Sequence, residues 1–243
     1  MNNFKKYIRK NSTIAEMVIL FTGIILILIG ERLAFSVLLG VGSSIVASAV
    51  VVFMTDVFLG GDDREIVKQW GLESVYRTRG EMNSSCDVYL KKARFLNIIA
   101  FGLKSFRETQ QKQVERILKN GGNIRIITMR PHCNNLKERE KDEMLPEDGI
   151  SLSIEQLINW AKQLNDKHYK GKVELRWHEH QPVDFLFMMD NRLFCGPYEF
   201  GKDSQQSVSF EYNNSGIAYE YYRNYFNKLW NDKEFCSDVF RKQ

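Results

Sequence analysis

The first sixty residues carry two long apolar stretches, whereas the rest of the chain alternates short apolar runs with amphipathic ones. Leu33 to Thr55 contains 23 residues without a charge, long enough to cross a hydrocarbon core of about 30 Å. Met17 to Gly30 is apolar but shorter, and it needs Ile14 and Ala15 to reach a similar length. Because only Gly30-Glu31-Arg32 separates the stretches, the pattern predicts a hairpin of two transmembrane helices.

The residues before the first apolar stretch predict its orientation. Lys5, Lys6, Arg9 and Lys10 have no acidic residue among them, which places the N-terminus in the cytosol by the positive-inside rule. Two crossings return the chain to the same side. We therefore expect an inner (cytoplasmic) membrane protein with both termini cytosolic and the lipid bilayer as a partner. A cleaved signal peptide is the alternative for the first stretch, but no A-x-A site follows it.

The pattern after the apolar stretches predicts an α/β domain, a mixed sheet flanked by helices. Strands are expected at 95–101, 123–129, 172–178, 184–189, 192–195 and 207–211, and helices at 105–120, 151–164 and 217–230. The charged segment 130–149 is predicted to be a solvated loop. The expected organisation is a basic tail (1–12), two transmembrane helices (13–59), a connector (60–93) and a cytosolic domain (94–243).

The composition of the chain mainly argues against certain partners and sites. The chain has 34 basic and 30 acidic residues, and the four-residue excess lies in the tail. The remainder is neutral, so no nucleic-acid partner is expected from net charge, although a local basic patch stays open. The four cysteines are widely and irregularly spaced, which predicts free thiols and no metal site. No cofactor is expected.

The domain resembles one half of a phospholipase D superfamily domain over roughly residues 86 to 236. The segment from Lys119 to Ile127 fits the end of that family's first β-α-β unit, and 153–176 fits the second. Asp190 and Gly196 fit an Asp and a Gly that follow the family's H-x-K strand. The resemblance implies a phospholipase D-like fold and a homodimer or higher homo-oligomer, because halves of this kind pair to complete a site.

The catalytic pair of that family is absent. Val183 and Phe185 stand at the His and Lys positions, and Pro197-Tyr198-Glu199 replaces the later Ser and Asn region. In the family the His attacks phosphorus and the Lys neutralises phosphate charge. Val and Phe can do neither, so the resemblance implies a degenerate, non-catalytic domain.

Other polar residues near the same strands are candidates for chemistry. His178 and His180 alternate with Glu179 in an extended segment, so their side chains share one side; with Asp184 they could form a His/carboxylate cluster for acid-base work. The alternatives are a polar turn for the histidines and a structural salt bridge to Arg176 or Arg192 for Asp184. The cluster defines an enzyme hypothesis with catalytic His178, His180 and Asp184.

Three further residues extend the predicted ligand site. Arg130 follows a strand end, and Tyr198 and Lys202 lie in the loop after Gly196. A lysine or arginine at such a position can meet a phosphate or another anion. An ordinary solvated loop is the alternative for each.

We weigh three functions from the sequence. The first is a membrane-anchored, non-catalytic phospholipase D-like sensor or effector that binds a small anionic ligand or a partner and acts through its hairpin. By analogy, small bacterial proteins of this layout often serve in antiphage defence. The second is a membrane-bound phosphodiesterase or phospholipase with a relocated active site. The third is a scaffolding membrane protein.

Overall fold

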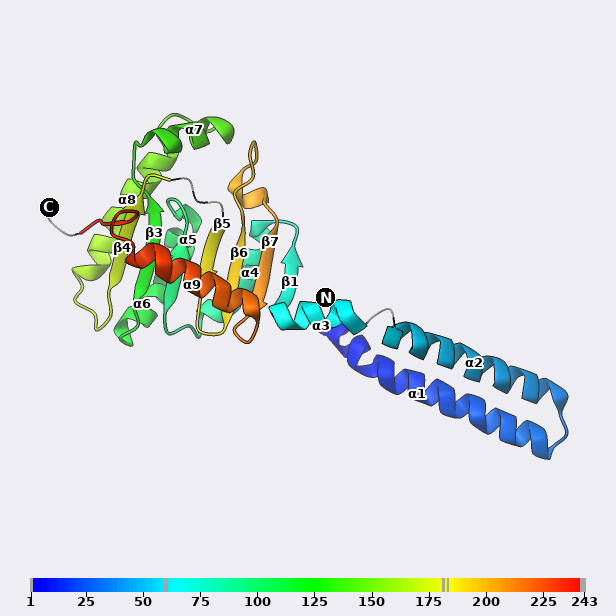
Figure 1. Cartoon of the computed structure of the whole chain (residues 1–243). Coiled ribbons are helices and arrows are strands. Elements are labelled where there is room, and N and C mark those ends of the chain that lie inside the picture. Colours follow the sequence, from blue (N-terminus) through cyan, green and yellow to red (C-terminus); the bar gives the residue numbers. More distant parts are fainter. Residues whose placement is uncertain (1, 59–60, 181, 183, 241–243) are drawn as a thin grey trace. The chain divides into compact units, whose positions relative to one another are not determined.

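Figure 1 shows the computed structural model of the chain. It describes the backbone of residues 2–58, 61–180, 182 and 184–240, and the side chains from residue 17 onward apart from 53 and 55–64. The chain divides into two compact units, Met1–Ile66 and Val67–Gln243. The first unit is helical, and the second holds the whole sheet.

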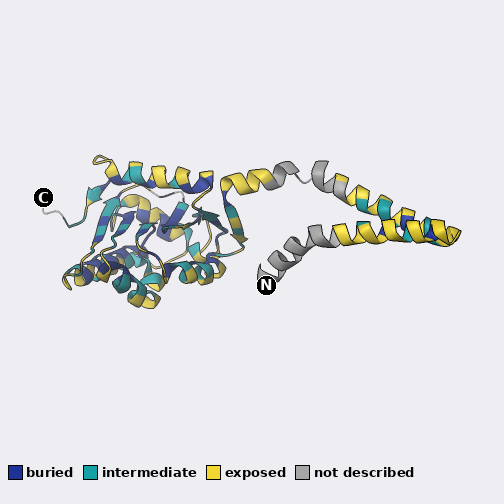
Figure 2. Ribbon diagram, turned by 90° about the horizontal axis from the view of Figure 1, so that it is seen from below, coloured by how far each residue is buried: buried dark blue, intermediate teal, exposed yellow. Residues whose placement is uncertain are grey.

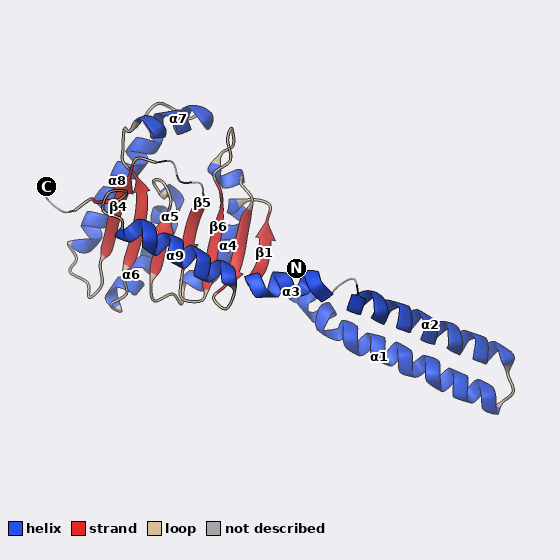
Figure 3. Cartoon of the chain, viewed as in Figure 1, coloured by secondary structure: helices blue, strands red, loops and turns tan. Residues whose placement is uncertain are grey.

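An eight-stranded mixed sheet forms the centre of the second unit (Figure 3). Its strands are β1 (Leu72–Tyr76), β2 (Leu96–Ile99), β3 (Ile124–Met129), β4 (Val173–His178), β5 (Asp184–Met188), β6 (Arg192–Pro197), β7 (Ser209–Asn213) and β8 (Ser237–Asp238). Their order is β1-β7-β6-β5-β2-β3-β4-β8. β2, β3 and β4 are parallel to one another, and all other neighbours are antiparallel. The parallel strands therefore define a carboxyl end and an amino end of the sheet.

Helices cover both faces of this sheet because successive strand residues point to opposite sides. On one face lies α9 (Ile217–Asn231), which buries Phe226 and Trp230 against strand residues such as Ile99 and Leu186 (Figure 1). The other face carries the larger core. It is covered by α4 (Arg79–Leu90), α5 (Lys104–Thr109), α6 (Gln111–Lys119) and α8 (Gly149–Asn165). The remaining helices of this unit are α7 (Asn134–Asp142), the short η1 (Ser204–Gln206) and α3 (Gly61–Trp70), of which residues 67–70 belong to the unit.

Two elements that precede β2 complete the sheet and its core. β1 pairs with β7, and α4 buries Met82, Cys86 and Leu90, which recur every fourth residue on one side of the helix. Thr78 caps α4, since its Oγ1 accepts the N–H of Glu81 at 3.2 Å. Residues 72–90, which the sequence pattern assigns to a connector, thus lie in the sheet and its core.

The other predicted elements of the domain match the structure to different degrees. The expected strands at β2 to β7 and the helices at α8 and α9 are present within a few residues, and the expected helix 105–120 is divided into α5 and α6 at Gln110. The prediction of a solvated loop over 130–149 is wrong. This segment contains α7, which buries Leu136, Arg139 and Glu140.

The first unit is a hairpin of α1 (Asn2–Arg32) and α2 (Ser36–Phe58). Gly42 is buried against α1, where a Cβ would stand 2.8 Å from the side chain of Ile27 and 2.9 Å from the carbonyl oxygen of Gly23. The helices approach closely at this point because Gly42 has no side chain. Many of the described side chains of the hairpin are exposed (Figure 2).

The predicted membrane crossing by this hairpin is corrected. Among the residues that the structure describes, no helix is long and apolar enough to span a bilayer. Residues 13–16, 53 and 55–59 of the predicted spans lie outside the described side chains. The transmembrane part of the predicted fold and the inner-membrane localisation are wrong on this finding.

Candidate functional site

All six residues of the predicted site lie at the carboxyl end of the sheet. The first residue of β5 belongs to this end because β5 is antiparallel to β2. Arg130 follows β3, His178 ends β4, His180 lies two residues later, Asp184 begins β5, and Tyr198 and Lys202 follow β6. The structure brings these positions to one end but divides their side chains between the two faces of the sheet.

His178 and His180 both stack on one aromatic ring beyond α9. Each imidazole centroid is 5.0 Å from the centroid of Phe235, with interplanar angles of 24° and 8°. His178 is buried, and its Nδ1 has no hydrogen-bond partner in the described part of the chain. Burial lowers the pKa of His178 to about 4, with a smaller contribution from His180. His178 is therefore a neutral packing residue near pH 7.

Asp184 lies on the α9 face but far from these histidines. Its Oδ2 accepts a hydrogen bond from the hydroxyl of Tyr222 at 2.9 Å. β2 and β3 separate β5 from β4, so three steps of about 4.8 Å place the two strands about 14 Å apart. In the described residues no group of three or more His, Cys, Asp or Glu could hold a metal ion. The structure therefore does not bring His178, His180 and Asp184 together, as the enzyme hypothesis requires.

Arg130 and Lys202 each have a carboxylate partner. The Nη1 of Arg130 is 2.7 Å from Oε1 of Glu179, and the guanidinium lies over Trp177. Lys202 pairs with Glu199, three residues earlier. Both cations are about half exposed. Neither offers an unpaired charge at this end of the sheet.

Arg79, the first residue of α4, is the functional candidate that the sequence pattern missed. The residue is only 7% exposed, and its guanidinium carbon lies 4.0 Å from the ring centroid of Phe185. No described carboxylate lies within 4.0 Å of this guanidinium. Buried arginines are normally paired. The signal that could have located α4, and with it Arg79, is the Thr78-x-x-Glu81 capping sequence.

A cleft of about 640 Å³ opens beside Arg79, on the face covered by α4, α5 and α8. Apolar side chains form much of its wall, namely Phe101, Leu103, Phe106, Ile150, Phe187 and Tyr198. Its polar side chains include Arg79, Asn83, Asp87, Lys104, Gln110 and Gln205. Small-molecule sites have this size and this mixture of an apolar wall with a few polar groups.

Tyr198 belongs to this cleft and not to the histidine side of the sheet. Its ring centroid is 4.6 Å from that of Phe101 and 6.2 Å from that of Phe185. Its hydroxyl is buried and makes no hydrogen bond to a described residue. Burial raises the pKa of Tyr198, and the charges of Arg79 and Arg139 offset part of the rise. The hydroxyl thus remains protonated beside the cleft.

A buried ion pair joins α7 to Glu143, a residue of the cleft wall that follows this helix. The Nε of Arg139 donates to Oε1 of Glu143 at 2.6 Å, and its Nη1 donates to the carbonyl oxygen of Glu199 at 2.9 Å. Burial raises the pKa of Glu143, although Arg139 offsets part of that rise. These contacts join α7 to the loop that carries Lys202.

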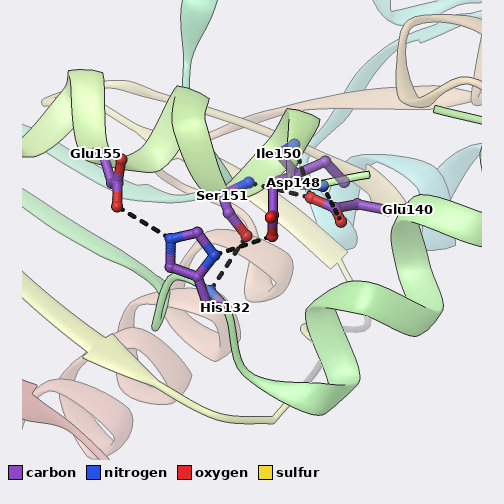
Figure 4. A network of polar contacts seen from close by, with 6 residues as sticks. All are labelled: His132, Glu140, Asp148, Ile150, Ser151 and Glu155. Atoms are coloured by element: carbon purple, nitrogen blue, oxygen red, sulfur yellow. Dashed lines mark hydrogen bonds and ion pairs between the residues drawn. The ribbon is translucent and has the colours of Figure 1, made fainter. Parts of the chain in front are cut away.

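Glu140, also on α7, caps the helix that borders the cleft (Figure 4). Its carboxylate accepts three backbone N–H groups, from Asp148 at 3.0 Å, Ile150 at 2.8 Å and Ser151 at 3.1 Å. The carboxylate of Glu140 therefore already occupies the amino terminus of α8, which is not available to bind an anionic ligand.

His132 ties the loop after β3 to the same helix (Figure 4). Its ring nitrogens lie 2.9 Å from Oδ1 of Asp148 and 3.0 Å from Oε1 of Glu155, and its backbone N–H donates to Oγ of Ser151 at 3.1 Å. These two carboxylates raise the pKa of His132. The polar groups of this network that the structure describes are hydrogen-bonded to one another. We therefore interpret the network as a structural support for the helix that borders the cleft.

Comparison with known proteins gives little further information. No family model matches the chain, and no curated protein matches it. Among solved structures, it is similar to TrmBL2, described as an archaeal chromatin protein with a novel mode of DNA binding. That likeness has a TM-score of 0.42 and 13% identity, and covers 77% of this chain and 68% of the other. It provides no basis for assigning a function.

These findings correct the predicted family and partners. None of these comparisons connects the chain to the phospholipase D superfamily. Val183 lies outside the described residues, and Phe185 is a core residue under Arg79. The membrane-anchored sensor or effector, the lipid bilayer partner and the expected homo-oligomer rested on that family and on the hairpin, and they are withdrawn. The expectation of no nucleic-acid partner, which rested on net charge alone, is withdrawn too.

Proposed function

We propose that residues 67–243 form a ligand-binding domain whose cleft holds a small organic monoanion. The observation that carries the proposal is Arg79, a residue only 7% exposed that lines the cleft and has no described carboxylate within 4.0 Å of its guanidinium. A buried charge costs several kcal/mol unless it is paired. An anionic group on a ligand would supply the missing partner.

The charges around the cleft favour one negative charge on the ligand. Arg79 and Lys104 are balanced by Asp87 and Asp203, and Glu143 is paired with a buried arginine. Asp87 also accepts a hydrogen bond from an amide of the wall. A polyanion would meet these carboxylates at short range, which costs free energy. A monoanion can use Arg79 without that repulsion.

The aromatic side chains of the wall favour a ligand with a flat apolar body. Phe101, Phe106, Phe187 and Tyr198 line the cleft, and aromatic walls stabilise flat rings by stacking and edge contacts. Of the residues predicted from the sequence, Tyr198 belongs to this site. The others, Arg130, His178, His180, Asp184 and Lys202, stay predictions of ligand contacts.

The test compares the full chain with its Arg79→Met variant by isothermal titration calorimetry. The probes are 1-naphthoate and 3′,5′-cyclic AMP, which each combine one negative charge with a flat ring system. We expect the wild-type chain to bind at least one probe, and the variant to bind it about tenfold or more weakly, because a charged hydrogen bond is worth about 1.5–3 kcal/mol. Arg223→Met, on exposed α9 surface, is the matched control.

A stability measurement separates this role from a structural one. If Arg79 serves a ligand, Arg79→Met leaves the empty chain equally stable or stabilises it, because a buried unpaired charge is removed. A large loss of stability in the variant would contradict the proposal. So would equal probe binding by both chains, or no binding of either probe by the wild type.

A further inference from the structure

The amino end of the sheet, opposite the cleft, has its own distinct chemistry. Three loops lead into the parallel strands there: 91–95 before β2, 119–123 before β3 and 166–172 before β4. They lie side by side, because the N–H of Leu96 donates to the carbonyl of Asn123 and the N–H of Ile124 donates to that of Lys172. The N–H of Gly171 also donates to the carbonyl of Leu118. We call these three loops the amino-end loops.

The amino-end loops concentrate positive charge. Their basic residues are Lys91, Lys92, Arg94, Lys119, Lys167, Lys170 and Lys172, and all seven are exposed. Their one acidic residue is Asp166. The chain after its basic tail has no net charge. The excess of positive charge at this end of the sheet is therefore not visible in the net charge of the chain.

Neighbouring carboxylates balance only part of this charge. Arg94 pairs with Asp190, Lys167 and Lys119 share Glu115, and Lys172 pairs with Glu174. These are exposed or partly exposed pairs, and such pairs are weak. A second group, Lys91, Lys92 and Lys170, makes no ion pair with any residue that the structure describes.

The surface is polar as well as basic. None of the large apolar side chains that the described chain exposes belongs to the amino-end loops. Proteins that lie in a membrane interface normally insert such side chains. Lys, Arg and Asn side chains on a polar surface instead provide the contacts that nucleic-acid phosphates receive. Asn120 and Asn123 lie among the cations.

We propose that the amino-end loops bind the phosphate backbone of a nucleic-acid duplex without sequence preference. The strength of this binding would come from displaced counterions, so it should fall steeply with salt. Lys91, Lys92 and Lys170 supply the free charges, and the paired cations add contacts when the duplex replaces their weak partners. The site is independent of the cleft at the opposite end.

The experiment measures binding of the full chain to a fluorescent 30-base-pair DNA duplex by anisotropy between 50 and 200 mM salt. We expect the triple variant Lys91→Ala/Lys92→Ala/Lys170→Ala to reduce the slope of log affinity against log salt by about 3 and to weaken binding at least tenfold at 50 mM. Lys137→Ala/Lys141→Ala/Lys228→Ala, which removes three exposed lysines elsewhere, should leave both quantities unchanged.

The same proteins are sedimented with vesicles of equal parts phosphatidylglycerol and phosphatidylcholine. Duplex binding that the first triple variant loses and the control keeps supports the proposal. Absence of duplex binding at 50 mM, or equal loss in both triple variants, overturns it. Vesicle binding that depends on the first three lysines, without duplex binding, overturns it in favour of an anionic lipid surface.

Discussion

Single side chains at the carboxyl end of the sheet differ mainly in whether another residue already satisfies them. Arg130 and Lys202 have carboxylates, whereas the equally charged Arg79 is buried without one among the described residues. The candidates from the sequence all lie at one end of the sheet, because residues at the ends of predicted strands can be counted. Sequence analysis could not rank the candidates, since the partner of Arg130 is Glu179 only through the geometry of two neighbouring strands.

The pKa values of two histidines are shifted in opposite directions. Burial lowers the pKa of His178 to about 4, and carboxylates raise that of His132 above its usual 6.5. Between pH 4 and 6.5 the unfolded chain protonates residue 178 and the folded chain does not, so His178 reduces stability as pH falls through that window. His132 stabilises the fold below pH 6.5, and this contribution is lost as pH rises through its folded pKa.

Nuclear magnetic resonance of the imidazole Cε1–H groups between pH 3.5 and 8.5 checks this pair. His178→Phe and His132→Gln assign the two resonances. We expect the His178 signal to stay at its neutral position down to pH 5, and the His132 midpoint to lie above 6.5. A His178 midpoint near 6.5 would contradict the burial seen in the structure.

At the scale of elements, sequence pattern succeeded where apolar periodicity is strong and failed where burial depends on charge. β2 and β3 are apolar runs, and the structure has them where they were predicted. In contrast, α7 has Leu136 as its only buried apolar residue, while Arg139 and Glu140 are buried through partners in other elements. No local pattern distinguishes such a helix from a solvated loop.

The cap that α7 provides for α8 gives an element-scale prediction. Glu140→Ala removes a carboxylate that accepts three backbone N–H groups, and should lower the free energy of unfolding by about 2 kcal/mol. Glu138→Ala, an exposed position on the same helix, should change it by less than about 0.5 kcal/mol. Urea unfolding followed by tryptophan fluorescence measures both. Equal effects would show that the cap contributes nothing specific.

At the scale of the whole molecule, properties averaged over long segments, such as net charge and apolar length, gave the least accurate predictions. The chain beyond the tail has no net charge, but its charges are unevenly distributed. The amino-end loops hold seven basic residues and one acidic residue. Likewise, the length and apolar character of the first two stretches predicted a membrane span, and no described helix meets that requirement. Topology was also beyond the pattern, because β1 joins the sheet through β7, more than 130 residues later in the chain.

The extent of the folding unit is the last prediction, and it concerns residues 67–93. α4 places Met82, Cys86 and Leu90 in the main core, and burial of such side chains contributes about 1.5–3 kcal/mol each. Their sum is comparable to the whole stability of a typical domain, about 5–15 kcal/mol. We therefore expect residues 67–243 to unfold cooperatively in urea, followed by circular dichroism, and residues 94–243 to lack a cooperative transition. Residues 78–243, which lose β1 but keep the Thr78 cap of α4, should be intermediate. If 94–243 unfolded with the same midpoint as 67–243, β1 and α4 would be a connector despite their place in the sheet and core.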